Sequence, residues 1–153
     1  NNKIVFMSMA ESGPDVKSAD QLKDLKIGTQ AGSAALGLLE KNEAYDSFKD
    51  NITEYDKYDT AIMDLKAGRE DVIAVDQVLG EYANNNLGGE MKECTYSLGD
   101  DFYTIGCASD NTELRDKIND AIKTLIDDGK AAEISEKWFG RDLVVFEPVE
   151  GEE

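Results

Sequence analysis

Histidine is absent from this 153-residue chain, and cysteine and proline are scarce, with two of each. Zinc and haem sites depend on histidine and cysteine ligands, and neither Cys94 nor Cys107 stands in a CxxC or Cys/His pattern. The sequence therefore predicts no metal and no cofactor. The same absence removes every Ser/His and Cys/His pair, so no catalytic residue is singled out among the many carboxylates.

Basic residues are also few, since 16 lysines and arginines stand against 33 acidic residues and give a net charge of −17. A strongly acidic surface disfavours nucleic acid and anionic membranes as partners. The charges are scattered through the expected helices and turns, which is typical of a solvated surface. Attraction of cationic solutes is the alternative, and it requires the charges to line a cleft.

Long apolar runs are missing as well. No stretch approaches the roughly 18 apolar residues that a membrane span needs, and no basic start with an apolar core marks a signal peptide. An apolar content of 41% instead favours an ordered globular chain with one core. The chain begins abruptly at Asn1 and continues into a strand-like segment, so a trimmed or processed piece is expected.

Strand-like and helix-like segments alternate along the middle of the chain. This order predicts an α/β fold with a mainly parallel sheet and flanking helices. Gly68 is expected to end the second helix, and the composition of Asn84–Gly89 indicates a loop. The three strand and helix pairs are 27–29 with 33–41, 52–55 with 60–67, and 72–75 with 77–84.

After residue 109 the pattern changes to two helices. Asp110 is expected to cap the first helix, with Glu113 in the capping-box position, and Gly129 to end it in a left-handed conformation. A second, shorter helix ends at Gly140. Apolar residues recur at helical spacing in both, namely Leu114, Ile118, Ala121, Ile122, Leu125, Ala131, Ile134 and Trp138.

Four segments of the chain resemble a known protein family. They are LKDLKIGTQAGSAA (22–35), DLKAGREDVIAVD (64–76), GDDFYTIGCASD (99–110) and the two-helix segment that ends in ISEKWFG (110–140). In this order they are similar to the bacterial solute-binding proteins that deliver polar amino acids to ATP-driven (ABC) importers. The resemblance implies the type II periplasmic-binding-protein fold, in which two lobes close around the ligand.

The family plan also implies how this chain is divided. Residues 1–109 would form the second, ligand-binding lobe with both crossing strands, 110–140 the C-terminal helices that pack on the first lobe, and 141–153 a tail. Most of the first lobe has no counterpart. The apolar helix faces are therefore expected to fold back on the lobe or to associate with another copy of the chain. The terminal EPVEGEE segment is expected to be frayed or part of a linker.

One candidate site is the turn at residues 30–34, where a strand ends and a helix begins. Its small residues expose backbone N–H groups that suit a carboxylate. The resemblance makes this turn, with Gly32, the ligand loop, in which Gln30 reaches the ligand and Ser33 and the amide of Ala34 receive its carboxylate. Many members carry a hydroxyl residue at position 34, so contact there would be limited to the backbone. The alternative is that Ser33 only caps its helix.

Asp76 is the second candidate, because it follows an apolar strand and precedes a helix. Its carboxylate can pair with an α-ammonium group, which is the role that the resemblance implies. The alternative is an N-cap, although a cap can still present a free oxygen. The arginine with which the family's first lobe binds carboxylates has no counterpart, because Arg69, Arg115 and Arg141 stand in other motifs.

Two further features leave alternatives open. Strand-like runs at 92–98 and 102–108 flank a Gly-Asp-Asp turn, and a hairpin there would bring Cys94 and Cys107 together as a disulfide. Buried free thiols are the alternative. Four aromatic residues are interpreted as core or hinge residues rather than as ligand-stacking rings: Tyr55, Tyr58, Phe102 and Tyr103.

The sequence thus predicts an extracytoplasmic binding component of an amino-acid ABC importer, either periplasmic or lipid-anchored at the outer face of the membrane. Its partners would be a free polar amino acid and a membrane permease that recognises the closed form. Two alternatives stay open. One is the ligand-sensing domain of a membrane receptor, and the other is a dehydratase-like enzyme on the same fold, which needs a positioned acid or base.

Overall fold

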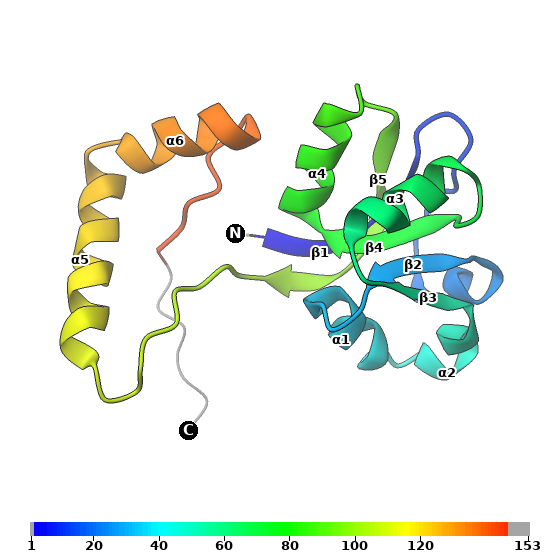
Figure 1. Ribbon diagram of the computed structural model, residues 1–153, viewed down its shortest axis with the longest axis horizontal. Helices are drawn as coiled ribbons and strands as arrows, with labels where there is room; N and C mark the ends of the chain where they lie inside the picture. Colours follow the sequence, from blue (N-terminus) through cyan, green and yellow to red (C-terminus); the bar gives the residue numbers. More distant parts are fainter. Residues whose placement is uncertain (1, 147–153) are drawn as a thin grey trace. The chain divides into compact units, whose positions relative to one another are not determined.

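The computed structural model describes residues 2–146 (Figure 1). Contacts divide them into two compact units, a larger one at Asn2–Asp101 and a C-terminal one that begins at Phe102. The EPVEGEE segment, expected to be frayed, lies outside the described residues. None of the helices within 2–146 combines the length and the hydropathy that a membrane crossing requires.

A five-stranded sheet in the order β3-β2-β4-β1-β5 forms the larger unit. β2 pairs in parallel with β3 and β4, whereas β1 pairs antiparallel with both β4 and β5. Four strands therefore share one direction and β1 runs against them, which confirms the expected α/β lobe with a mainly parallel sheet. The strands are β1 (Asn2–Met9), β2 (Ile27–Gln30), β3 (Ile52–Tyr55), β4 (Val72–Asp76) and β5 (Met91–Asp101).

Helices cover both faces of this sheet, with α1 and α2 on one side and α3 and α4 on the other (Figure 1). All three predicted pairs of strand and helix are confirmed. The predicted loop at Asn84–Gly89 is wrong in its first part, because α4 continues to Asn86. The helices are α1 (Ala34–Glu40), α2 (Tyr45–Phe48), α3 (Tyr58–Lys66) and α4 (Gln77–Asn86), with 3₁₀ helices η1 (Ala19–Asp24) and η2 (Lys49–Asn51).

The core has two layers because side chains alternate across each strand. On one face Phe6 and Ala74 pack in the cluster that contains Leu39 of α1. On the other face Val5 and Ile73 belong to the cluster formed with α3. All four strand residues are fully buried, so the central strands are apolar on both faces, as sheets covered on both sides require.

A hairpin between residues 92 and 108 is not present in the structure. The Gly-Asp-Asp segment continues β5, since Gly99 lies opposite Ile4 and Asp101 lies opposite Asn2. Residues 102–108 have no strand partner and form no strand. Strand pairing with β1 has thus overridden the turn tendency of glycine and aspartate. Cys94 is a buried free thiol and Cys107 a half-buried free thiol, so the disulfide alternative is not supported.

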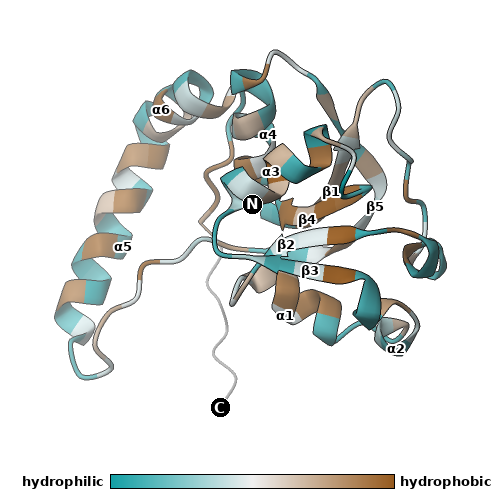
Figure 2. Ribbon diagram, turned by 45° about the vertical axis from the view of Figure 1, so that its right-hand side comes forward, coloured by the Kyte–Doolittle hydropathy of each residue, from teal (hydrophilic) through white to brown (hydrophobic). Residues whose placement is uncertain are grey.

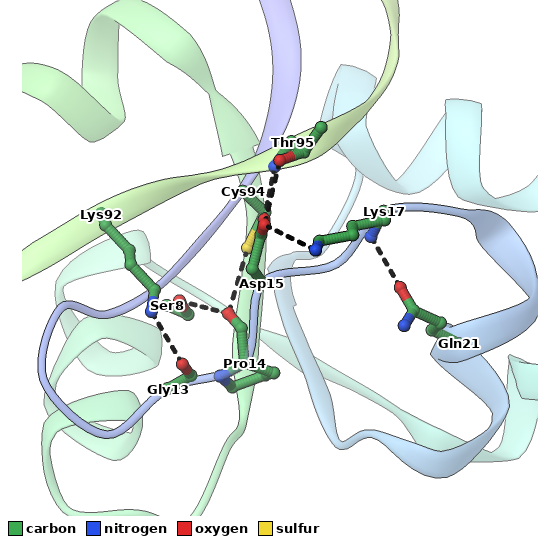
Figure 3. Close-up of polar contacts among 9 residues, drawn as sticks. All are labelled: Ser8, Gly13, Pro14, Asp15, Lys17, Gln21, Lys92, Cys94 and Thr95. Atoms are coloured by element: carbon green, nitrogen blue, oxygen red, sulfur yellow. Dashed lines mark hydrogen bonds and ion pairs between the residues drawn. The ribbon is translucent and has the colours of Figure 1, made fainter.

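The outer edge of β5 is covered by the loop that follows β1 (Figure 3). Asp15 accepts hydrogen bonds from the Thr95 amide at 2.7 Å and the Thr95 hydroxyl at 3.0 Å. The first of these bonds is the main reason that the pKa of Asp15 lies below its ordinary value. Lys92 Nζ donates to the Gly13 carbonyl at 2.9 Å, and Ser8 donates to the Pro14 carbonyl at 2.7 Å. The loop therefore satisfies groups that an open edge strand would expose.

The C-terminal unit contains α5 (Thr112–Asp127) and α6 (Lys130–Phe139). Asp110 was expected to cap α5, but the cap is Asn111, whose side chain accepts a hydrogen bond from the Leu114 amide at 3.2 Å. Both residue types are good caps, so sequence alone did not decide between neighbours. Gly129 has a φ of 75°, which confirms the predicted left-handed end of α5, and α6 ends at Gly140 as expected, with a φ of 76°.

The helices of the C-terminal unit carry apolar side chains that are not buried. No residue of α5 is buried, and Trp138 of α6 is 61% exposed. Figure 2 shows hydrophobic segments in brown along both helices. The buried Ser135 instead ties α6 to the following chain, since it donates to the Arg141 carbonyl at 2.9 Å and accepts from the Leu143 amide at 2.8 Å.

Candidate ligand-binding site

Both predicted site segments lie at one edge of the sheet. β2 and β4 are neighbouring parallel strands, and Ile27 pairs with Val72 and Gly28 with Ile73. The residues that follow each strand therefore leave the sheet at its same carboxyl edge, where α/β proteins bind ligands. The turn at 30–34 leads from β2 into α1, and Asp76 leads from β4 into α4.

Ser33 is the N-cap of α1. Its hydroxyl accepts a hydrogen bond from the Leu36 amide at 3.2 Å. The same hydroxyl lies 3.5 Å from the Thr29 hydroxyl, which is buried and donates to the Ala74 carbonyl of β4 at 3.0 Å. Because a hydroxyl has one hydrogen, Ser33 must be the donor in its contact with Thr29. Ser33 therefore does cap its helix, and Thr29 connects the turn at 30–34 to β4.

The remainder of the turn is tied to the end of β3. Gln30 Nε2 donates to the Asp56 carbonyl at 2.9 Å, and the Ala31 amide donates to the Tyr55 carbonyl at 2.9 Å. Gly32 has a φ of 67°, a left-handed conformation that glycine adopts without cost. Ala34 is exposed at the first position of α1, where backbone amides have no acceptor within the helix. The turn is therefore held by the sheet while its tip faces outward.

Asp76 is the N-cap of α4, and its capping role is likewise confirmed. Oδ1 accepts from the Leu79 amide at 3.3 Å, and Oδ2 accepts from Asn2 Nδ2. The Asn2 side chain also accepts from the Val78 amide at 3.4 Å. Asp76 is partly exposed, whereas Asn2 is 2% exposed. Each carboxylate oxygen therefore has one protein donor and keeps a further lone pair.

Two residues of this arrangement, Thr29 and Asn2, were not singled out in the sequence. The sequence around them gives no contrast that would mark them, since Asn2 is flanked by Asn1 and Lys3 and Thr29 by Gly28 and Gln30. Their partners are remote, since Thr29 reaches Ala74 and Asn2 reaches Asp76 from separations of 45 and 74 residues. Only the strand order brings these groups together.

A second polar cluster lies beside the end of β3. The Tyr55 hydroxyl is 2.7 Å from Glu70 Oε1 and 2.9 Å from Asp64 Oδ2. Burial, followed by these two contacts, raises the pKa of Tyr55 above its ordinary value. Arg69 pairs with Asp64 and is the main reason that the pKa of Asp64 is lowered. Glu70 is buried, and its Oε2 atom has no hydrogen-bond partner.

The four aromatic residues divide into two pairs. Tyr55 and Tyr58 pack against the core cluster beneath α3, which agrees with their interpretation as core residues. Phe102 and Tyr103 are 43% and 73% exposed, so core packing is wrong for this pair, and the hinge contact stays a prediction. Within residues 2–146, no three histidine, cysteine or acidic side chains are grouped as metal ligands would be.

Comparison with known proteins gives a consistent match. The family model for "Bacterial extracellular solute-binding proteins, family 3" matches residues 29–141. The L-cystine-binding protein TcyJ of Escherichia coli K12 is 31% identical over 133 residues, which are 84% of this chain and 47% of that protein. The arginine-binding periplasmic protein of Mannheimia haemolytica is 33% identical, and the alignment covers 81% of this chain and 52% of that protein. The chain spans about half the length of the curated relatives it matches.

Solved structures show the same fold. A substrate-binding protein of an ABC uptake transporter from Streptococcus pneumoniae, solved with bound histidine, aligns with a TM-score of 0.76 and 28% identity. The alignment covers 95% of this chain and 60% of that one. An ancestral arginine-binding protein bound to arginine aligns with a TM-score of 0.71 and 29% identity. This alignment covers 91% of this chain and 61% of that one.

Proposed function

Because this chain belongs to family 3 of the bacterial extracellular solute-binding proteins, we propose that it is the ligand-binding lobe of an amino-acid-binding protein that serves an ABC importer. One observation carries the proposal. Two helices begin at the same carboxyl edge of neighbouring strands, and one start offers backbone amides while the other offers a carboxylate. This polarity fits a zwitterion with an anionic end and a cationic end.

The ligand that we propose is a free polar amino acid. Its α-carboxylate would lie against the turn formed by Gln30, Gly32, Ser33 and the Ala34 amide, since unsatisfied N–H groups favour anions. To donate to this carboxylate, the Ser33 hydroxyl would give up its long contact with Thr29. The α-ammonium group would bind Asp76 through a charge-assisted hydrogen bond. The named relatives bind cystine and arginine, which both carry these two groups.

The larger assembly is part of the same proposal. Residues 1–109 would act as the second lobe, and a first lobe of the kind present in the relatives would close the site, with the residues after 109 packing on it. A membrane permease would recognise the closed form on the extracytoplasmic side of the membrane, where the protein would be periplasmic or lipid-anchored. Ligand binding without a covalent step is the proposed role, because the family and the named relatives are binding proteins.

The exposed apolar residues of α5 and α6 would be covered when such a first lobe is present. In this chain alone, we propose that the same residues drive self-association. Burial of one large apolar side chain is worth about 1.5–3 kcal/mol, so several exposed side chains supply a substantial driving force. The residues concerned are Leu114, Leu125, Ile134 and Trp138, which are 42–61% exposed.

Isothermal titration of the twenty amino acids into the full gene product that contains this chain tests the proposed function. One or a few polar amino acids should bind, and apolar amino acids should not. A well-folded protein that binds none of the twenty would contradict the proposal and would direct the search to a different solute.

A further inference from the structure

Asn2 connects the start of β1 to the start of α4. Its Nδ2 atom donates to Asp76 Oδ2, and its Oδ1 atom accepts from the Val78 amide at 3.4 Å. The residue is 2% exposed and lies two positions before Ile4, the residue that pairs with Asp76 across the sheet. We propose that Asn2 is a positioning residue that fixes the Asp76 carboxylate for a ligand ammonium group. The inference rests on the proposed function.

The carboxylate is held at two points that belong to different elements. Oδ1 is held by the Leu79 amide of α4, and Oδ2 is held by Asn2 of β1. Two such contacts restrict rotation about both side-chain torsions of Asp76, so its remaining lone pairs keep a fixed direction. A hydrogen bond to a charged group is stronger than a neutral one, which suits Asn2 for this task.

The same contacts decide which sign of charge the site accepts. The first-turn amides of Val78 and Leu79 donate to Asn2 and Asp76, so they are not free to receive an anion. Among the described residues 2–146, no lysine or arginine forms an ion pair with Asp76, in contrast to Asp64 and Asp46, which pair with basic side chains. An uncompensated, oriented carboxylate at a partly exposed position favours a cationic group with several N–H donors.

This role differs from that of a ligand contact. Asn2 is almost completely buried, and its polar atoms already have protein partners, so it acts through Asp76. It also lies opposite Asp101 in the pairing of β1 with β5. The orientation of the ammonium site therefore depends on strand β1 as well as on the junction of β4 and α4 that carries Asp76.

The test uses Asn2→Leu in the full gene product, because leucine has the same number and branching of side-chain heavy atoms and no hydrogen-bonding group. Isothermal titration should show about tenfold or weaker binding of the amino acid that the wild type binds. Binding of the corresponding deaminated acid, which lacks the ammonium group, should be nearly unchanged. Asn2→Ala serves as a second, smaller change should the leucine variant fold poorly.

Asn51→Leu is the matched control. Asn51 also bridges two segments of the lobe, because its Nδ2 atom donates to the Lys23 carbonyl at 2.7 Å, but it lies away from Asp76. The Asn51→Leu substitution should lower the unfolding temperature and leave the ratio of the affinities for the amino acid and the deaminated acid unchanged.

Three-bond NMR couplings of Asp76 give a measurement without ligand. They should show one χ1 rotamer in the wild type and an average over several χ1 rotamers in Asn2→Leu.

The outcomes separate the two claims. If the wild type binds an amino acid and the Asn2 variants bind both ligands as the wild type does, the positioning role is overturned and the proposed function stands. An unchanged single χ1 rotamer of Asp76 in Asn2→Leu also overturns the positioning role. If the wild type binds none of the amino acids, the proposed function and the positioning role of Asn2 for a ligand fall together.

Discussion

Single hydroxyl groups connect remote parts of this lobe. Tyr55 reaches Glu70 and Asp64 beside α3, and Thr29 reaches the backbone of β4. The capping roles of Ser33 and Asp76 could be predicted from the sequence, because a polar residue between a strand and a helix is a local signal. The contacts of Thr29 and Asp76 with their remote partners could not be predicted, because they depend on the order of strands in the sheet.

The Tyr55 cluster predicts a specific dependence of stability on pH. Burial and two carboxyl neighbours raise the pKa of Tyr55 above its ordinary value of 10.0, so the folded chain keeps the phenol proton where the unfolded chain has lost it. The stabilisation is fully present below about pH 10 and decreases as the pH rises further.

Urea unfolding of wild type and Tyr55→Phe at about pH 9 and about pH 11 measures this effect. The wild type should lose more unfolding free energy between the two pH values than the variant does, because phenylalanine does not titrate. Equal losses in the two proteins would contradict an elevated pKa of Tyr55.

At the scale of elements, the alternation of strands and helices was visible in the sequence, because each strand of the βα units is a short apolar run followed by a helical pattern. The end of β5 could not be predicted in the same way. Gly99 and the two following aspartates favour a turn locally, and only pairing with β1 extends them as a strand. The start of the predicted loop at Asn84–Gly89 is a second case. The local composition favours a loop, whereas the Asn84 side chain forms two hydrogen bonds of 2.8 Å with the backbone of Met91.

The turn before α1 offers a matched pair of glycines for a stability test. An added Cβ would meet no atom within 4 Å at either Gly32 or Gly37, but only Gly32 has a positive φ. Gly32→Ala should destabilise the chain by about 1–2 kcal/mol because of left-handed strain. Gly37→Ala, inside α1, should stabilise it by about 0.5–1 kcal/mol. Urea unfolding measures both, and a shift in the same direction for both variants would contradict the assigned conformation of the turn.

At the scale of the whole molecule, the two compact units differ in how well they bury their apolar residues. The larger unit has a two-layered core, whereas α5 has no buried residue. The sequence predicted both C-terminal helices and their apolar spacing. It could not show what covers these faces, because that depends on a first lobe of the kind present in the relatives or on a second copy of the chain.

Self-association of this chain is the expected consequence of the exposed residues. Light scattering over a range of concentrations should show a dimer or larger species, and Trp138→Glu should shift the distribution towards the monomer. Met63→Glu is the control, because Met63 is 66% exposed in α3 of the larger unit. A strictly monomeric wild type, or an equal effect of both substitutions, would contradict the role of the C-terminal helices.

The central claim is that Asp76 binds the ammonium group of a polar amino acid, and Asp76→Asn tests it most directly. Asparagine keeps one oxygen to accept from the Leu79 amide, so the N-cap of α4 should be kept while the charge is removed. Isothermal titration into the full gene product should show at least about tenfold weaker binding of the amino acid, with binding of its deaminated analogue unchanged. Equal affinity of wild type and Asp76→Asn for the amino acid would contradict the account.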